Sequence, residues 1–346
     1  MKKPISLIMT LVLAASLLTA CGTQPASGSA GSQPQTSAAS GSSQAGSAAS
    51  QQNSSESDKT AYKVGVIQLT EHAALDAANQ GFCDVLNESG LNITIDQQNA
   101  QGDQSACQTI ATKLVNDKND LILAIATPAA QAVAGATSDI PVLGTAITDF
   151  AESGLVNDNA APGTNVSGTS DLTPIKEQID LLKKILPDAK TVGILYCSAE
   201  DNSRIQADMA KEACDNLGLS HEVFTVSSTN EIQTVVESMV GKVDVIYAPT
   251  DNVIANGMAT VAMVATENKL PIICGEAGMV DKGGLATYGI DYYQLGRMTG
   301  EMALSILKGE SSPAEMPIQY LEAAKCELTV NEETAAALNI DLSVLD

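Results

Sequence analysis

The sequence predicts an α/β protein with two lobes of the same topology, each built on a parallel sheet. The main observation is an internal repeat, because an apolar strand pattern at residues 62–67 and the amphipathic helix after it recur from residue 190. The two copies begin 128 residues apart (190 − 62), which is far longer than the repeat of a solenoid. The second observation is size, since the roughly 290 residues after Ser57 suit two cores better than one.

The elements of the two copies follow one another in the same order. The matching segments, given as first and second copy, are strands 62–67 and 190–195, helices 75–86 and 205–213, strands 92–96 and 221–225, strands 121–127 and 243–249, and strands 140–143 and 270–273. Nearly continuous apolar strands between amphipathic helices indicate parallel sheets that are covered on both faces. Because ligands of such sheets bind beyond the carboxyl ends of the strands, the repeat predicts one binding cleft between two facing lobes.

The N-terminal segment is typical of an exported protein. Two lysines precede an apolar run over residues 7–18, which is too short to span a bilayer. Small residues just before Cys21 resemble the lipobox of bacterial lipoproteins, so residues 1–20 are expected to be a signal peptide and Cys21 to carry the lipid. The alternative is an ordinary signal peptide with the cysteine incidental. Residues 21–58 are then the lipidated cysteine and a disordered linker rich in Ser, Gly, Ala and Gln.

Charge and cysteine usage exclude several classes of partner. Without residues 1–20 the chain has 16 basic and 41 acidic residues, a net charge of −25 (16 − 41), which repels nucleic acid and anionic lipid head groups. No two cysteines stand at C-x-x-C spacing, only two histidines exist and no nucleotide-binding loop is present, so no metal and no cofactor is expected. The six cysteines after Cys21 are expected to be free thiols, although a Cys83–Cys107 disulfide is conceivable.

Polar residues gather where the predicted strands end. Thr127, which precedes a proline, is expected to be the N-cap of a helix whose N-terminus can seat a carboxylate. Asp251 or Glu276 of the second copy can hold an ammonium group, while Thr148 of the first copy offers a hydroxyl donor. This charge placement favours a zwitterionic ligand. The candidate ligand-binding residues are Gln68, Glu71, Thr127, Ala129, Thr148, Asp149, Tyr196, Glu200, Asn202, Ser203, Asp251, Asn252 and Glu276.

Five ordered motifs resemble one protein family. They are residues 64–72, 98–103, 126–131, 249–252 and 289–293. They resemble the ABC-transporter substrate-binding lipoproteins whose characterised members bind aromatic amino acids such as tyrosine, tryptophan or phenylalanine. The resemblance implies the type I periplasmic-binding-protein fold, with two Rossmann-like lobes joined by three crossovers, and delivery of a captured solute to an ABC permease in the membrane. We expect a monomer. One departure is Phe150, where the family often has proline.

The resemblance also suggests where the chain passes between the lobes. The expected crossovers are residues 165–169, 286–290 and 317–320, the first lobe is residues 59–170 plus 287–318, and the second lobe is residues 171–286 plus 319–346. Residues 291–307 are then expected to form a helix of the first lobe. Exposed or core positions are expected for Tyr292 and Tyr293 rather than positions at the cleft.

Several alternatives stay open at this point. A hydrolase is the main enzymatic rival, but there is no G-x-S-x-G motif and His72, the histidine nearest the cleft, is expected at the surface or in a cap. No catalytic residue is therefore assigned, and Glu71 and Glu200 could simply cap helices. A nucleoside or sugar receptor of the same fold, or a sensing or adhesive surface lipoprotein, also fits. In each case the expected location is the extracellular face of a Gram-positive cell membrane.

Overall fold

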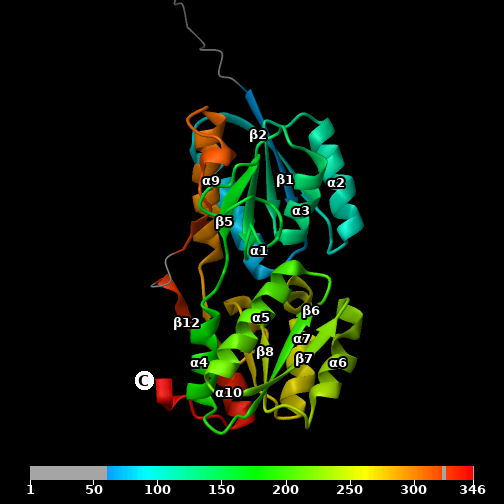
Figure 1. Cartoon of the computed structure of the whole chain (residues 1–346), viewed down its shortest axis with the longest axis vertical. Coiled ribbons are helices and arrows are strands. Elements are labelled where there is room, and N and C mark those ends of the chain that lie inside the picture. The colour runs from blue at the N-terminus through cyan, green and yellow to red at the C-terminus, as the bar shows by residue number, and fades with distance from the viewer. Residues whose placement is uncertain (1–60, 322–324, 346) are drawn as a thin grey trace, which may run out of the picture. The chain divides into compact units, whose positions relative to one another are not determined.

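Two six-stranded sheets organise the part of the chain that the computed structural model describes, residues 61–321 and 325–345 (Figure 1). The predicted signal peptide, the lipidation of Cys21 and the whole predicted linker lie outside these residues, as does everything else before residue 61. No described helix has the length and apolarity that a membrane span requires. The described His, Cys, Asp and Glu side chains form no cluster that could hold a metal ion.

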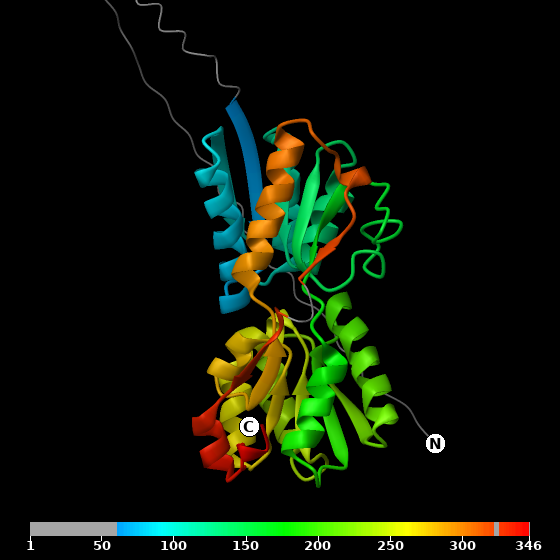
Figure 2. The same cartoon turned by 90° about the vertical axis from the view of Figure 1, so that its left-hand side faces the viewer.

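The first sheet is parallel throughout and has two helices on each face (Figures 1 and 2). In spatial order its strands are β11 (Gln319–Tyr320), β5 (Val166–Ser170), β4 (Val142–Ile147), β3 (Leu121–Ile125), β1 (Ala61–Gln68) and β2 (Asn92–Asn99). One face is covered by α1 (Ala73–Glu88) and α9 (Tyr292–Leu307), and the other by α2 (Gln104–Asn116) and α3 (Thr127–Ala136). Because β3 is buried along its whole length, both of its faces are apolar, which explains its unbroken run of Leu, Ile and Ala.

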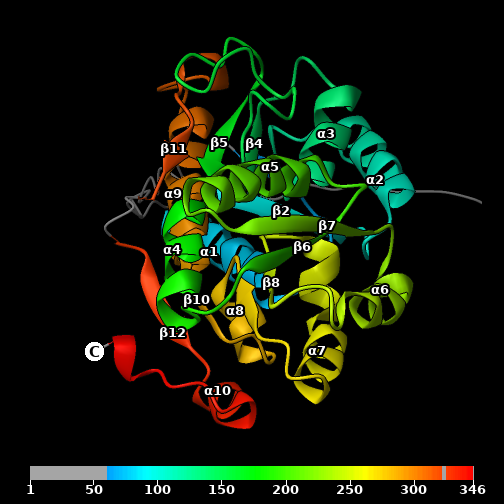
Figure 3. The same cartoon turned by 60° about the horizontal axis from the view of Figure 1, so that its bottom comes forward.

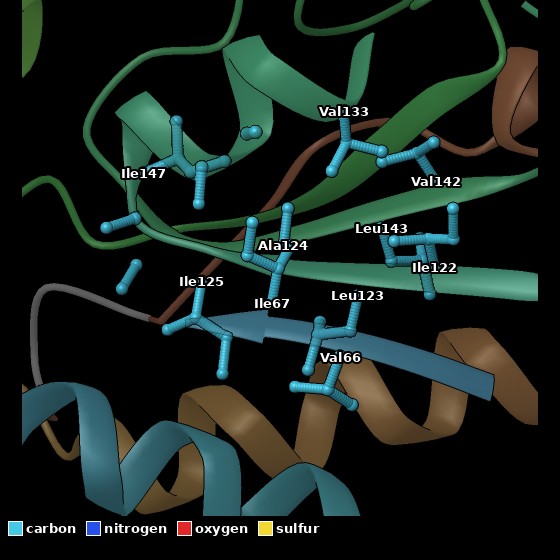
Figure 4. Close-up of a cluster of buried hydrophobic side chains, with 14 of the residues drawn as sticks. Val66, Ile67, Ile122, Leu123, Ala124, Ile125, Val133, Val142, Leu143 and Ile147 are labelled. Atoms are coloured by element: carbon cyan, nitrogen blue, oxygen red, sulfur yellow. The ribbon is translucent and has the colours of Figure 1, made fainter. Parts of the chain in front are cut away.

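The core of the first lobe lies between the sheet and these two helix layers (Figure 4). Val66 of β1 and Leu123 of β3 are partners in register and lie toward α1 and α9, whereas Val133 of α3 lies on the opposite side of the sheet. Burial of each such side chain contributes about 1.5–3 kcal/mol, so packing on both faces is the main source of stability in this lobe.

The second sheet is parallel except for its last strand (Figures 1 and 3). In spatial order its strands are β12 (Glu327–Val330), β10 (Ala286–Gly289), β9 (Ile272–Cys274), β8 (Val245–Ala248), β6 (Thr191–Cys197) and β7 (Ser220–Val226). Its helices are α4 (Ile175–Ile185) and α5 (Asp201–Asn216) on one face, and α6 (Ile232–Met239), α7 (Asn252–Glu267) and the short α8 (Ala277–Asp281) on the other, with α10 (Glu332–Leu338) beside α7. Short 3₁₀ turns occupy Thr229–Glu231, Pro313–Glu315 and Ser343–Leu345.

The two sheets repeat one topology. The spatial order β2-β1-β3-β4-β5 of the first sheet corresponds to β7-β6-β8-β9-β10 of the second, with β11 and β12 as the outermost strands. Each strand pair of the predicted repeat is present in these equivalent positions. The predicted fold class, two α/β lobes with parallel sheets, is therefore confirmed.

The chain crosses between the sheets in short segments that follow β5, β10 and β11. The first crossing follows β5 and leads into α4, and the second follows β10 and leads through Ile290 and Asp291 into α9. The third crossing was expected at residues 317–320, with residue 319 onward in the second lobe. That placement is wrong, because Gln319 and Tyr320 pair with β5 and extend the first sheet. The crossing follows Tyr320 and precedes β12.

Helices α1 and α9 pack backbone against backbone. A Cβ atom on Gly81 would collide with the carbonyl oxygen of Tyr293, and one on Gly296 would collide with the carbonyl oxygen of Ala78. Only glycine allows this approach, since any larger residue would separate the helices. The contact holds α9 in the first lobe, as expected, and fixes the position of its first residue, Tyr292.

The cysteines of the described residues are all free. Five of them are buried and Cys326 is half-buried. Burial in apolar surroundings raises the pKa of the Cys83 and Cys107 thiols to about 11, so both are inert near neutral pH. The expectation of free thiols agrees with the structure, and the conceivable Cys83–Cys107 disulfide is not formed.

Candidate ligand-binding site

Hydrogen bonds between the strand-end loops and the first two turns of the helices that follow them hold the two lobes together. The contacts are His72 Nε2 to Asn252 Oδ1 (3.1 Å), Asn256 Nδ2 to Thr70 Oγ1 (2.8 Å), Gln104 Nε2 to the Ala199 carbonyl (3.0 Å), Gln131 Nε2 to Asp201 Oδ2 (2.9 Å) and Gln206 Nε2 to Thr148 Oγ1 (3.1 Å). Each joins a residue before the first crossover to one after it. The lobes are therefore closed on each other at the carboxyl ends of their strands, where the sequence predicted the cleft.

A small cavity lies inside this contact region. Its walls from the first lobe and the first crossover are His72, Leu75, Ala146, Thr148, Asp171 and Tyr292, and its walls from the second lobe are Asn202, Thr250, Asp251, Asn252, Ala255 and Glu276. Its volume is about 20 Å³, which is room for about one water molecule. A solute the size of an amino acid therefore requires the lobes to separate or the side chains in the walls to move.

A wider hollow of about 750 Å³ adjoins the cavity on the side of β2 and β7. The loops that follow β1, β2, β6 and β7 line it, together with the first turns of α7. Glu71 and Glu200 are the carboxylates in its wall. Asn252 lines both spaces, so the bond between His72 and Asn252 lies at the boundary between them.

Three buried carboxylates line the cavity and a fourth, Glu200, lies behind Asn252, with no buried cation among the described residues. Asp171, Glu200, Asp251 and Glu276 are each at most 5% exposed, and no Lys or Arg is buried among the described residues. Burial raises the pKa of Asp171 to about 6 and that of Glu276 to about 7. Burial also raises the pKa values of Glu200 and Asp251, and the charge of Asp251 raises that of Glu200 further. Such a site favours a ligand that brings a positive charge.

Asp251 and Glu276 occupy equivalent roles at helix starts. Asp251 is the N-cap of α7, and its carboxylate accepts hydrogen bonds from the backbone N–H groups of Cys197 (2.6 Å) and Ile254 (2.8 Å). Glu276 is the N-cap of α8 and accepts from the N–H of Gly278 at 2.6 Å. The Ser203 side chain and the Val253 N–H also donate to Asp251, and the Met279 N–H also donates to Glu276. Because a carboxylate can accept about four hydrogen bonds, Glu276 keeps lone pairs that can face a ligand, whereas a ligand at Asp251 shares an oxygen that already accepts from the protein.

Glu200 connects two asparagines of the second lobe. Its Oε2 accepts from Nδ2 of Asn202 (3.0 Å) and from Nδ2 of Asn252 (2.7 Å). Ser203 stabilises the ionised form of Asp251, since its side chain donates to that carboxylate and lowers the pKa. Glu200 and Ser203 do not line the cavity, but they hold in place residues that do. Glu200 binds Asn202 and Asn252, and Ser203 binds Asp251.

The predicted site residues fall into three groups. Those that line the cavity are Thr148, Asn202, Asp251, Asn252 and Glu276. Those that line the hollow or support the cavity are Glu71, Glu200 and Ser203. Those that belong to the lining of neither space are Gln68, Thr127, Ala129, Asp149 and Tyr196.

The third group has local structural roles. The Gln68 amide donates to the Thr70 carbonyl and to Asp76, and Asp149 accepts from Asn159 and from the backbone of Glu152. Ala129 is in the core of the first lobe, and Tyr196 packs against the core of the second. Thr127 was expected to be an N-cap, which is wrong. The helix begins at Thr127 itself, its N-cap is Ala126 with φ = 80°, and the threonine hydroxyl finds no partner among the described residues.

Three residues that shape the cavity were not among the predicted site residues. His72 is the N-cap residue of α1, but its side chain makes no cap bond and is buried against the second lobe. Tyr292 packs in the core as expected, yet it also lines the cavity and donates to Asp171 at 3.0 Å. Asp171 directly follows β5, so the rule that ligands bind at strand ends could have identified it.

Fold and site together define a two-lobed protein of the solute-binding class. The family model described as "ABC transporter substrate binding protein" matches residues 63–344. The chain belongs to this family, whose fold is that of the type I periplasmic binding proteins. The family consists of substrate-binding proteins and not of enzymes, in agreement with the missing catalytic motifs.

Three similar proteins carry informative names. A tyrosine-binding protein of Clostridioides difficile (strain R20291) is 41% identical over 343 residues, which cover 98% of this chain and 93% of the relative. The structure of an ABC domain of Streptococcus pneumoniae in complex with L-Trp has 42% identity and a TM-score of 0.79, covering 83% of this chain and 98% of that one. A ligand-free, open substrate-binding protein with adhesive properties from Clostridium difficile has 45% identity and a TM-score of 0.63, covering 81% and 95%.

Proposed function

We propose that the protein captures a zwitterionic aromatic amino acid, such as tyrosine, tryptophan or phenylalanine, in the cavity between its lobes. The observation that carries this proposal is the set of buried carboxylates at the cavity, three in its wall and Glu200 behind Asn252, with no buried Lys or Arg among the described residues. A ligand ammonium supplies the missing charge, because an opposite charge within a few ångströms favours ionised carboxylates. Asp251 and Glu276 are the proposed partners of the ammonium group.

The first lobe supports the other half of a zwitterion. Thr148 Oγ1 lies 3.5 Å from Asp171 Oδ1, which is long for a hydroxyl hydrogen bond, so this O–H group can turn toward a ligand carboxylate. The N-terminus of α3, proposed from the sequence as a carboxylate seat, is not supported, since Thr127 does not line the cavity. Thr148 is therefore the better supported donor.

The comparisons support both the ligand class and the closing motion. A relative named for tyrosine and a neighbour in complex with L-Trp favour an aromatic amino acid. This structure superposes better on the L-Trp complex than on the open, ligand-free neighbour (TM-scores of 0.79 and 0.63), although the identities are 42% and 45%. A rotation of the lobes between open and closed forms accounts for that difference, because it changes the overall superposition while each lobe keeps its fold.

The proposal also includes the cellular setting. Cys21 is proposed to carry a lipid that anchors the protein to the extracellular face of a bacterial cell membrane, with the following Ser-rich segment as the linker. A permease of an ABC importer, driven by a cytoplasmic ATPase, is proposed to receive the ligand. A monomer fits this role, since one cavity is built from the two lobes of one chain.

Titration calorimetry with residues 21–346 carrying Cys21→Ser tests the ligand class. We expect 1:1 binding of one or more aromatic amino acids and none of glucose or adenosine. Because the sequence has no Trp, indole fluorescence during titration with L-tryptophan comes only from the ligand. Strong binding of a nucleoside or a sugar, with no heat from any aromatic amino acid, would contradict the proposal and leave the fold unchanged.

Two charge-removing variants test the proposed ammonium contact. Asp251→Asn or Glu276→Gln should weaken binding by about 10- to 150-fold, since a lost hydrogen bond to a charged group costs about 1.5–3 kcal/mol. Glu71→Gln is the matched control, because this carboxylate is exposed and lines the hollow rather than the cavity. If neither cavity variant exceeds the control, the ammonium assignment is wrong.

A second candidate function is adhesion, favoured by the adhesive properties named for the neighbour of 45% identity. The two functions are compatible, because a surface receptor can both bind a solute and contact a partner. Binding of the Cys21→Ser protein to cultured epithelial cells, with and without saturating L-tyrosine, tests this candidate. Cell binding that is no greater than that of an unrelated acidic protein would exclude it.

A further inference from the structure

His72 lines the cavity and has one ring nitrogen engaged across the lobes and the other without a partner among the described residues. Its side chain is nine-tenths buried, and Nε2 lies 3.1 Å from Oδ1 of Asn252 in the second lobe. Nδ1 is buried and has no hydrogen-bond partner among the described residues. Because an unpaired buried polar atom is costly, such an atom in a cavity wall indicates a group that is completed by a ligand.

The neighbouring residues determine which nitrogen carries the proton. Nδ2 of Asn252 donates to Oε2 of Glu200 at 2.7 Å, so the other side-chain atom of Asn252, Oδ1, faces His72. The opposite amide orientation would place oxygen against a carboxylate oxygen. Since Oδ1 can only accept, Nε2 of His72 must donate, and in a neutral imidazole Nδ1 is then an acceptor. Glu200 thus sets the tautomer of His72 through Asn252.

A second unpaired acceptor lines the same cavity from the other lobe. Asn202 also donates through Nδ2 to Oε2 of Glu200, at 3.0 Å, which leaves its Oδ1 as an acceptor. This oxygen is buried and without a partner among the described residues. The cavity wall therefore contains one residue from each lobe with an unpaired buried acceptor, His72 with Nδ1 and Asn202 with Oδ1.

We propose that Nδ1 of His72 and Oδ1 of Asn202 accept hydrogen bonds from the ammonium group of the bound ligand, so that a neutral His72 with its proton on Nε2 is required for tight binding. This inference rests on the proposed function, because the amino-acid ligand provides the ammonium group. It adds neutral acceptors to the carboxylates already described. His72 then contacts the ligand through Nδ1 and the second lobe through Nε2, so the same residue links ligand binding to closure of the lobes.

Burial favours the neutral form of His72. Burial lowers its pKa, and so does the charge of Lys282, while the bond to Asn252 and the charge of Asp76 oppose this shift. The other titratable groups around the cavity are Asp171, Asp251, Glu276 and Tyr292, with Glu200 behind Asn252. Below the His72 pKa the imidazolium would present an N–H group to the ligand's own N–H groups, so affinity should fall.

Two substitutions separate the two nitrogens of His72. In His72→Gln the terminal amide reaches the position of Nε2 and can donate to Asn252, but no acceptor stands at the position of Nδ1. In His72→Asn the side-chain oxygen can stand near the position of Nδ1, while the bond to Asn252 is lost. With L-tyrosine as the ligand, we expect His72→Gln to bind about tenfold or more weakly than the unsubstituted protein. His72→Asn should recover part of the loss and bind at least about fivefold more tightly than His72→Gln.

A tyrosine analogue without the amino group, 3-(4-hydroxyphenyl)propanoic acid, tests whether His72 binds the ammonium group of the ligand. The loss of affinity from L-tyrosine to this analogue should be larger for the unsubstituted protein than for His72→Gln. His221→Gln is the control, because His221 lies beside Asp215 in the second lobe and should leave binding unchanged. Equal binding by His72→Gln and the unsubstituted protein, or equal losses in both His72 variants, would overturn the proposal.

Nitrogen-15 NMR of the unsubstituted protein tests the tautomer independently of any variant. The sequence has only two histidines, so His72→Gln assigns both rings. We expect a protonated Nε2 and an unprotonated Nδ1 at pH 7, and a change in the Nδ1 signal when L-tyrosine is added. A proton on Nδ1 would overturn the inference. If no aromatic amino acid binds the unsubstituted protein, the proposed function fails, whereas the tautomer measurement still tests the geometry of His72.

Discussion

The hydroxyl of Tyr292 donates a 3.0 Å hydrogen bond to Oδ2 of Asp171. Asp171 directly follows β5 at the first crossover, and Tyr292 begins α9 just after the second crossover. The bond therefore ties together two of the connections about which the lobes can rotate. Both residues also line the cavity, so the same bond links the hinge to the ligand site.

Tyr292→Phe should lower the free energy of unfolding by about 1–3 kcal/mol, because it leaves the buried Asp171 carboxyl with one donor fewer. Urea denaturation of the ligand-free protein measures the change. Tyr293→Phe is the matched control, since its hydroxyl donates to Asp84 in a partly buried setting. Equal effects of the two substitutions would contradict the role given to the bond between Tyr292 and Asp171.

Stability of the ligand-free protein should fall as the pH rises from about 4 to about 7. Burial raises the pKa of Asp171 to about 6 and that of Glu276 to about 7, whereas both groups titrate near 4 in an unfolded chain. In this interval the folded state binds more protons than the unfolded state, so the free energy of unfolding decreases with pH. Their stabilising effect is complete below about pH 4 and is lost as the pH passes the folded pKa values. Thermal denaturation at several pH values measures the slope, which should be shallower in Glu276→Gln; identical slopes would exclude Glu276 as a source.

Ligand binding near pH 6.5 should release protons. The cavity carboxyls are partly protonated at this pH, and a ligand ammonium favours their ionised forms. Calorimetric titrations with L-tyrosine in two buffers of different ionisation enthalpy should therefore give different apparent binding enthalpies. The affinity should also increase from pH 5 to pH 7.5. A binding enthalpy that does not depend on the buffer would show that the carboxyls do not change protonation on binding.

Gly81→Ala should destabilise the protein by about 1–3 kcal/mol, because the added methyl group has no space against the backbone of α9. Gly135→Ala is the matched control, since it also replaces a helical glycine but nothing lies within 4 Å of its added Cβ atom. That change should be neutral or stabilising, as alanine favours the helix. Chemical denaturation distinguishes the two, and a neutral Gly81→Ala would show that α1 and α9 separate without cost.

The fold could be predicted from the sequence because its signals are local and repeated. β3 is an apolar run that the equivalent strand β8 repeats, and α1 and α5 follow equivalent strands with the same helical period. The end of the third crossover could not be placed in this way. β11 is only two residues long, and its pairing with β5 depends on contacts between residues about 150 positions apart, such as Gln319 and Thr169.

The site could be predicted only in part, because a sequence shows which residues end strands but not which way their side chains point. Asp251 and Glu276 follow strands of the second sheet and reach the cavity, whereas Asp149 follows an equivalent strand and turns back to its own loop. His72 looked like a cap because it precedes a helix. Its burial depends on Asn252, which is 180 residues away and belongs to the other lobe.

The outermost strand of each sheet comes from the last part of the chain, β11 in the first and β12 in the second. Neither lobe is therefore a continuous segment of the chain. Each sheet lacks its sixth strand, β11 or β12, until the residues beyond 318 have been synthesised. During synthesis from the N-terminus, the first lobe cannot be completed before the second has been translated. Completion of both lobes is thus a single late event, and a chain that ends early would leave β5 and β10 as unpaired edge strands.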